Sequence, residues 1–81
     1  MADGSVQFTE RQRLQFERQL AEHGKESLEK SRTALHRRLA EHFQKLEEIR
    51  QVGDYTSSVE REIQNFQQQI AAINDILWRE S

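Results

Sequence analysis

Cysteine and proline are absent from this chain of 81 residues, and glycine occurs only three times. The lack of cysteine excludes disulfides as a source of stability and agrees with a reducing compartment. The lack of proline and the scarcity of glycine leave few residues that would interrupt a helix, and the chain is rich in Glu, Gln, Arg and Leu, which favour helices. We therefore expect an almost wholly helical, all-α protein.

Long apolar runs are also missing, and the first twenty residues carry six charged side chains. We therefore expect neither a signal peptide nor a membrane span, and an intracellular, cytoplasmic location. Apolar residues make up 35% of the chain, which is low for a self-sufficient globule. A single core contributes only about 3–5 kcal/mol of folding stability to a chain of this length. We therefore expect helices that share an apolar surface with another chain.

The strongest pattern is an apolar stripe with strict 4-3-4-3-4 spacing in the last third of the chain. Its members are Val59, Ile63, Phe66, Ile70, Ile73 and Leu77. Such spacing keeps all of them on one helical seam, as in knobs-into-holes pairing. A second row with similar spacing is formed by Leu35, Leu39, His42, Leu46 and Ile49. If the chain folds back at Gly53, the two rows meet in antiparallel order, which predicts a helical hairpin with a coiled-coil-like seam.

The start of the chain differs from the rest. Residues 1–8 show no periodicity and are predicted to form a flexible tail, followed by a single helical domain over residues 9–81. Thr9 and Gln12 match a capping box, which marks the start of a helix. A long first helix should therefore span about residues 10–52.

The end of the first helix is marked by Gly53, which can adopt the left-handed conformation of a helix C-terminus. A turn is expected at residues 53–57, and a second helix over about residues 58–79. Two helices bury only one side of each other, so a second chain or a partner is expected to complete the core.

Gly24 leaves two interpretations of the first helix open. It could end one helix and precede another, or it could lie inside a continuous helix at a cost of only about 1 kcal/mol relative to alanine. A row of residues seven apart crosses Gly24 without a change of phase: Leu14, Ala21, Leu28, Leu35, His42 and Ile49. Because a loop would usually reset this register, the continuous helix is favoured.

An uncharged window runs from Ile63 to Asn74, although charged residues make up 32% of the chain. Its polar members are all amides: Gln64, Asn65, Gln67, Gln68, Gln69 and Asn74. A solvated helix face in so charged a chain would carry Glu and Lys, so the window predicts that more than the seam is covered. Trp78 is placed with the seam and interface residues, because tryptophan is enriched at interface hot spots; the alternative is that it caps the end of the bundle.

Basic residues form a row of their own in the first half of the chain. Its members are Arg11, Arg18, Lys25 and Arg32, each seven apart, with Arg37 and Arg38 as an extension. The row could bind an acidic protein surface or the phosphates of a nucleic acid, or its long side chains could simply cover the edge of the seam. Nucleic acid is disfavoured because four interspersed glutamates would repel phosphate and because the net charge is −2.

No arrangement suited to catalysis, a cofactor, a metal or a small-molecule substrate stands out. His23, His36 and His42 lack the i,i+3 or i,i+4 spacing of metal ligands on one helical face, and no nucleophile–base pair or phosphate loop occurs. The sequence therefore predicts a non-enzymatic protein-interaction module: a small helical subunit, adaptor or co-chaperone of a larger assembly, or a self-associating bundle. A nucleic-acid-binding helical dimer that uses the basic row is the alternative.

Overall fold

The computed structural model describes residues 7–53 and 55–80. Within these ranges it contains three helices and no strand: α1 spans Glu10–His23, α2 spans Lys25–Val52 and α3 spans Ser57–Glu80. The all-α fold class is confirmed, with three helices in place of the expected two. Of the tail predicted for residues 1–8, positions 1–6 lie outside the described residues, as does position 54 of the predicted turn.

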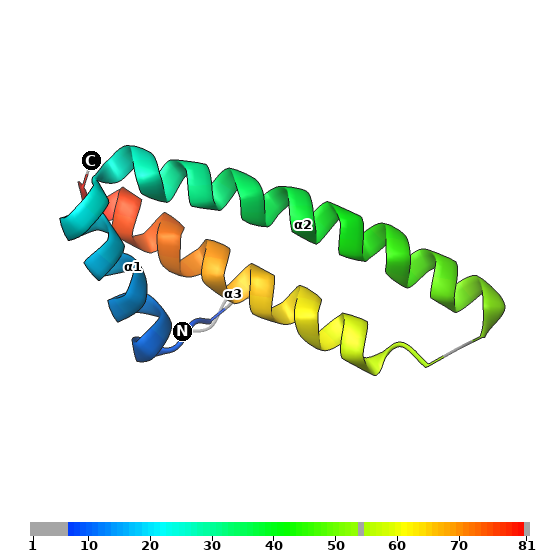
Figure 1. The fold of residues 1–81 in the computed structure, drawn as a ribbon. Helices are drawn as coiled ribbons and strands as arrows, with labels where there is room; N and C mark the ends of the chain where they lie inside the picture. Colours follow the sequence, from blue (N-terminus) through cyan, green and yellow to red (C-terminus); the bar gives the residue numbers. More distant parts are fainter. Residues whose placement is uncertain (1–6, 54, 81) are drawn as a thin grey trace.

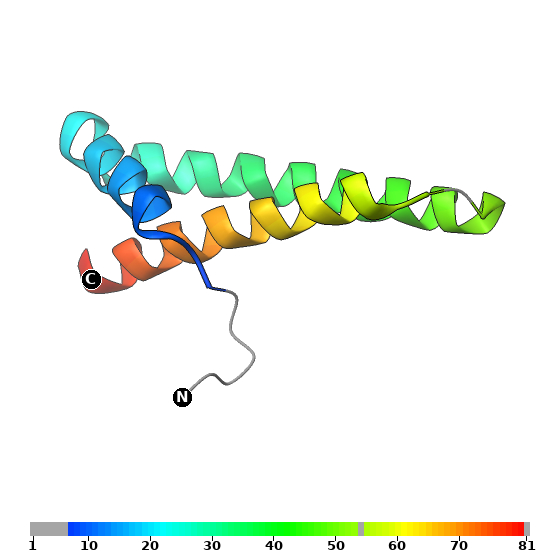
Figure 2. The same cartoon turned by 90° about the horizontal axis from the view of Figure 1, so that it is seen from below.

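The two long helices form the body of the molecule. α2 and α3 lie side by side and run in opposite directions (Figure 1). α1 lies at the end of this α2–α3 pair where α2 begins and α3 ends, and it crosses one face of the pair (Figure 2). The molecule is accordingly elongated, with principal extents of 45 × 30 × 19 Å. α1 thus covers, from within the chain, part of the surface that was expected to need a partner.

The predicted capping box at the start of α1 is confirmed. The Gln12 N–H donates to Thr9 Oγ1 at 3.1 Å, and the Thr9 N–H donates to Gln12 Oε1 at 2.9 Å. These two bonds satisfy backbone donors that a helix start would otherwise leave unpaired. One turn later, Arg13 Nε and Glu17 Oε2 form an i,i+4 ion pair at 3.1 Å. Local interactions therefore define this end of α1.

Gly24 separates α1 from α2, so the favoured continuous helix is wrong. Its φ of 89° and ψ of 173° lie in a region of backbone conformation that is essentially reserved for glycine. The Gly24 N–H donates to Leu20 O at 2.9 Å, and the Ser27 N–H donates to Gly24 O at 3.2 Å. The glycine therefore closes one helix and opens the next.

The break resets the inward face of the first helix, which the unbroken seven-residue row did not indicate. Phe16 is 4% exposed and packs into the core, whereas Leu14 is 57% exposed. On α2 the inward positions include Leu28 and Leu35, both of which are buried. Two residues turn a helix by about 200°, so α1 presents to the core the side opposite to Leu14.

Gly53 ends α2 as the sequence predicted. It adopts the left-handed conformation with φ 74° and ψ 23°, and its N–H donates to Arg50 O at 3.1 Å. α3 then begins at Ser57, one residue before the expected boundary. Across the turn, Arg50 Nη2 and Glu60 Oε2 lie 3.9 Å apart, an exposed ion pair that adds little stability.

The core consists of two clusters of buried side chains. The larger contains Phe16, Leu28, Leu35, Ile70, Ala72, Ile73, Ile76 and Leu77. The smaller lies toward the turn and contains Leu46, Val59 and Ile63, with Leu39 and Ile49 partly buried beside it. All three helices contribute to the larger cluster, whereas only α2 and α3 contribute to the smaller one. The turn end of the molecule is therefore only two helices thick.

Replacing Phe16 by alanine should destabilise the protein by about 3–5 kcal/mol, because truncating a buried aromatic side chain leaves a cavity. Leu14→Ala is the matched control on the same helix and should change the free energy of unfolding by no more than about 0.5 kcal/mol. Urea unfolding followed by circular dichroism measures both. Equal losses would show that the row containing Leu14 also faces the core.

Gly24→Ala should cost about 1–3 kcal/mol of stability, because an L-residue is strained at this φ and ψ, even though no atom lies within 4 Å of the added Cβ. Gly53→Asn is the control, since asparagine visits the left-handed region readily. Small-angle X-ray scattering gives a second readout: if α1 and α2 join to relieve the strain, the radius of gyration rises above 14.5 Å. Unchanged stability and size would contradict a break at this position.

Candidate functional site

The predicted seam residues lie where α2 and α3 meet, with one exception. Seven are buried: Leu35, Leu46, Val59, Ile63, Ile70, Ile73 and Leu77. Four are partly buried: Leu39, His42, Ile49 and Phe66. Trp78 is the exception, because it is 80% exposed. It therefore does not serve as a buried cap at the end of the bundle.

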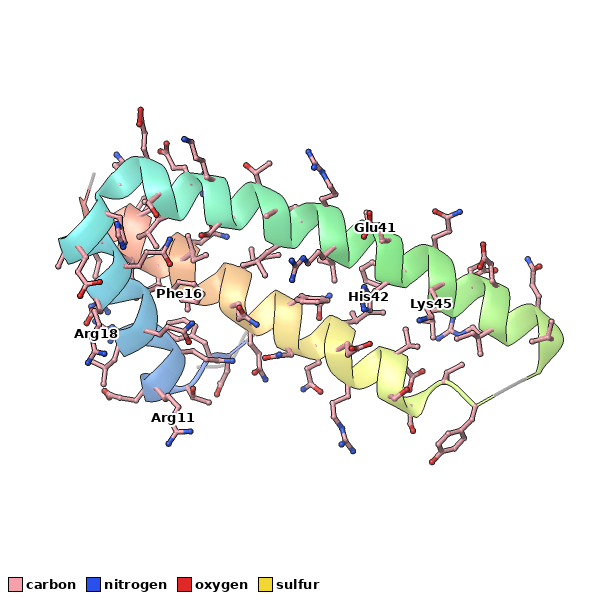
Figure 3. The ribbon with its side chains drawn as sticks, viewed as in Figure 1. Arg11, Phe16, Arg18, Glu41, His42 and Lys45 are labelled. Carbon is pink, nitrogen blue, oxygen red and sulfur yellow. The ribbon has the colours of Figure 1, made fainter. Side chains whose placement is uncertain are left out.

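His42 lies between α2 and α3 (Figure 3) and contacts groups on both. Its Nδ1 lies 2.9 Å from Arg38 O, one turn earlier on α2, and its Nε2 lies 3.2 Å from Glu62 Oε1 on α3. The ring meets that of Phe66 edge-on, with the centroids 4.9 Å apart. Both ring nitrogens therefore have polar neighbours, as a partly buried polar side chain requires. The contacts join the two helices at a seam position.

α1 covers one side of the uncharged window through contacts between amides. Gln12 Nε2 lies 3.3 Å from Asn65 Oδ1 and 3.2 Å from Gln68 Oε1. An amide is both donor and acceptor, so a row of glutamine and asparagine can bond to another amide without leaving a charge under the covering helix. This part of the window is therefore bonded to α1, with Gln68 partly buried and Asn65 still exposed.

The same face of the pair continues onto α2. Gln19 Nε2 lies 2.8 Å from Ser27 Oγ and 2.9 Å from Ser31 Oγ, so α1 is tied to the first two turns of α2. Phe16, three positions earlier on α1, is itself buried in the larger cluster. The face under α1 is thus apolar where Phe16 packs, and the side-chain hydrogen bonds that join it to Gln12 and Gln19 of α1 come from amide and hydroxyl groups.

The positions of residues around the axis of α3 show which of them lie on the face of the pair opposite to α1. Ala72 and Ile76 are buried in the same cluster as Phe16 of α1. Asn74 and Trp78 follow them by two positions, and two positions turn a helix by about 200°. Asn74 and Trp78 therefore point away from α1. α1, which is the third of the described helices, lies on the other face of the pair (Figure 2).

On this opposite face α2 and α3 are joined by a hydrogen bond. Arg32 Nη1 donates to Asn74 Oδ1 at 2.8 Å. A shallow hollow beside the bond is lined by Lys25, Glu29, Arg32, Asn74, Leu77 and Trp78. The exposed indole of Trp78 thus stands next to two basic side chains and one acidic one, at the end of the pair that holds α1.

Phe43 extends this face toward the turn. It follows Arg32 by eleven positions, which brings it back to within about 20° of the same side of α2, and it is 46% exposed. On α3, the residues of this side recur with 4-3-4 spacing: Gln67, Ala71, Asn74 and Trp78. We define the open face by these residues: Lys25, Glu29, Arg32 and Phe43 of α2, and Gln67, Ala71, Asn74 and Trp78 of α3.

The structure divides the predicted basic row between two helices. Arg11 and Arg18 project from α1 away from the α2–α3 pair (Figure 3) and flank the exposed Leu14. The other members belong to α2: Lys25, Arg32, Arg37 and Arg38. Lys25 and Arg32 lie on the open face, whereas Arg11 and Arg18 lie on a helix that covers the other face. No single helical face therefore carries the whole row.

Four residues of the larger cluster were not predicted as site or seam residues. Leu28 belonged only to the row of residues seven apart, and the others are Phe16, Ala72 and Ile76. The available signal was their i,i+4 spacing, Phe16 with Leu20 and Ala72 with Ile76, which marks a second apolar side on each helix. Phe43 was also missed, because an isolated aromatic residue beside a regular seam carries no periodic signal.

Among residues 7–53 and 55–80, no group of three or more His, Cys, Asp or Glu side chains could hold a metal ion. None of the helices described in this structure combines the length and the apolar character that crossing a bilayer requires. Comparison with protein-family models, with curated proteins and with solved structures finds no significant match to this chain. The function must be inferred from the arrangement of the residues themselves.

The contact between Arg32 and Asn74 should be measurable as a coupling energy of about 0.5–1.5 kcal/mol, the usual net contribution of a hydrogen bond. A double-mutant cycle with Arg32→Ala and Asn74→Ala isolates that energy from other effects of the substitutions. The cycle of Arg37→Ala with Asn74→Ala is the control and should show additive losses. Additive losses in both cycles would mean that α2 and α3 are not in this register on the open face.

Proposed function

We propose that this protein is a non-enzymatic protein-interaction module, a small helical subunit, adaptor or co-chaperone of an assembly. In this proposal α2 and α3 act as a helical hairpin with a coiled-coil-like seam, and a protein surface completes the core by packing over the open face. The observation that carries the proposal is the exposure of two aromatic side chains, Trp78 and Phe43, which helix geometry assigns to the same uncovered side of the pair.

The energetics favour this face as a docking surface. A large aromatic side chain can bury about 150–250 Å², and each Å² of apolar surface removed from water stabilises a contact by roughly 25 cal/mol. Covering a tryptophan that is 80% exposed therefore contributes several kcal/mol, which can offset part of the entropy lost on association. Tryptophan is also among the residues that most often dominate binding energy at interfaces.

The open face as a whole resembles a protein interface in its polarity. The α3 part of the open face carries no charge between Gln67 and Asn74, and charged residues are depleted at the centre of interfaces. The charged members, Lys25, Glu29 and Arg32, lie together on α2 at one end of the face. That arrangement gives an uncharged centre and a polar rim.

The alternative of nucleic-acid binding has less support from the geometry. Phosphate recognition needs several basic side chains along one surface, and the break at Gly24 separates Arg11 and Arg18 from Lys25 and Arg32. Glu29 also lies within the group that includes Lys25 and Arg32, where it would repel phosphate.

A photo-crosslinking amino acid at position 78 should give discrete protein adducts in the cells that express this protein, because a partner over the open face lies within reach of that position. Gln44 is the control position, since it is exposed on α2 but about 100° away from Phe43. Mass spectrometry identifies the adducts. Equal yields from positions 78 and 44, or no adduct from either, would contradict the proposal.

A further inference from the structure

The α3 part of the open face can pack against the same surface of a second copy without repulsion between like charges. In a two-fold contact between identical surfaces each residue meets the same patch of the other copy, so any charge at the centre would face a like charge. Gln67, Ala71 and Asn74 carry no charge, and the amides among them both donate and accept hydrogen bonds. In a chain of which 32% is charged, an uncharged and self-compatible stripe is an unusual surface.

The sizes of the side chains along this stripe fit a close crossing of two helices. Ala71 is the smallest residue of the stripe and stands between Gln67 and Asn74, and small side chains allow helix axes to approach within about 8–10 Å. Trp78 lies seven positions beyond Ala71, about 10 Å along the helix. If two α3 helices cross at Ala71 in antiparallel directions, each Trp78 lies level with Gln64 of the other α3, at the start of its uncharged window.

The charge distribution along the pair selects the antiparallel direction. The α1 end, residues 10–38 and 70–80, holds nine basic and seven acidic side chains, which gives a charge of +2. The turn end, residues 39–69, holds three basic and six acidic side chains, which gives −3. An antiparallel copy sets each basic end over the acidic end of the other copy, whereas a parallel copy would superpose like charges.

We propose that the occupant of the open face is a second copy of this chain, related by a two-fold axis near Ala71, so that two α2–α3 pairs form an antiparallel four-helix bundle with an α1 on each outer side. The proposal rests on the proposed function, because it names the partner that covers the open face. It also accounts for the exposure of Phe43 and Trp78, since both lie on the surface that becomes the centre of the bundle.

Sedimentation equilibrium and fluorescence test this arrangement. The mass should rise with concentration from 9.6 kDa toward twice that value. Trp78 is the only tryptophan of the chain, so its emission should shift to shorter wavelength over the same concentration range as the indole leaves water.

Charge substitutions at Ala71 identify the surface. Ala71→Glu and Ala71→Lys should each weaken self-association at least about tenfold, because each places two like charges face to face at the crossing point. An equimolar mixture of the two variants should restore association, since the charges then attract. Ala21→Glu is the matched control: it makes the same substitution at an exposed position of α1, on the covered side of the pair, and should leave association unchanged. Circular dichroism checks that all variants keep their helicity.

Three outcomes would overturn the inference: a mass of one chain at the highest concentration at which the protein stays in solution, a dimer that Ala71→Glu weakens no more than Ala21→Glu, or a mixture of the Ala71 variants that fails to associate. The crosslinks from position 78 separate this failure from that of the proposed function. Adducts to a different protein in a chain that stays monomeric would overturn only the second copy as occupant, whereas a monomer that gives no adducts would overturn both.

Discussion

The insertion of Phe16 between α2 and α3 is the contact on which the position of α1 depends. Phe16 is the one buried residue of α1, and it reaches the core only because Gly24 turns the chain back over the start of α2. If α1 continued along the axis of α2, Phe16 could not lie in the same cluster as Ile73 and Ile76. The placement of α1 also decides which side of the α2–α3 pair is covered and which side remains open.

Local signals were sufficient to predict an all-helical chain, the end of α2 at Gly53 and the burial of most of the α3 stripe from Val59 to Leu77, because these features depend on helix spacing and on glycine at a helix end. They were insufficient at Gly24. The seven-residue spacing of the row that contains Leu14 continues across Gly24, and a glycine inside a helix costs only about 1 kcal/mol. Local interactions alone therefore scarcely distinguish a continuous helix from a break at this position. The burial of Phe16 then decides the outcome, and that contact with α3 has no signature in the local sequence.

The candidate site could be predicted only in part, for the same reason. The lack of charge between Ile63 and Asn74 indicated that more than the seam is covered, but it could not show which side each amide faces. In the structure, the Gln12 side chain of α1 donates hydrogen bonds to Asn65 and Gln68 on one side of α3. Asn74 lies on the other side of α3, where it accepts a hydrogen bond from Arg32. The basic row failed as a single surface because its spacing has meaning only on an unbroken helix.

The unequal burial of the helices has a consequence for the motions of the molecule. α1 packs on the α2–α3 pair through one buried aromatic side chain and a few side-chain amide hydrogen bonds. Detachment of α1 therefore exposes far less apolar surface than separation of α2 from α3. We therefore expect hydrogen exchange of the α1 backbone to proceed through a local opening that leaves the α2–α3 pair intact. During each opening, the apolar side chains that share a cluster with Phe16, among them Ala72 and Ile76, become exposed to solvent. Such an opening would make a second, apolar side of α3 accessible without global unfolding.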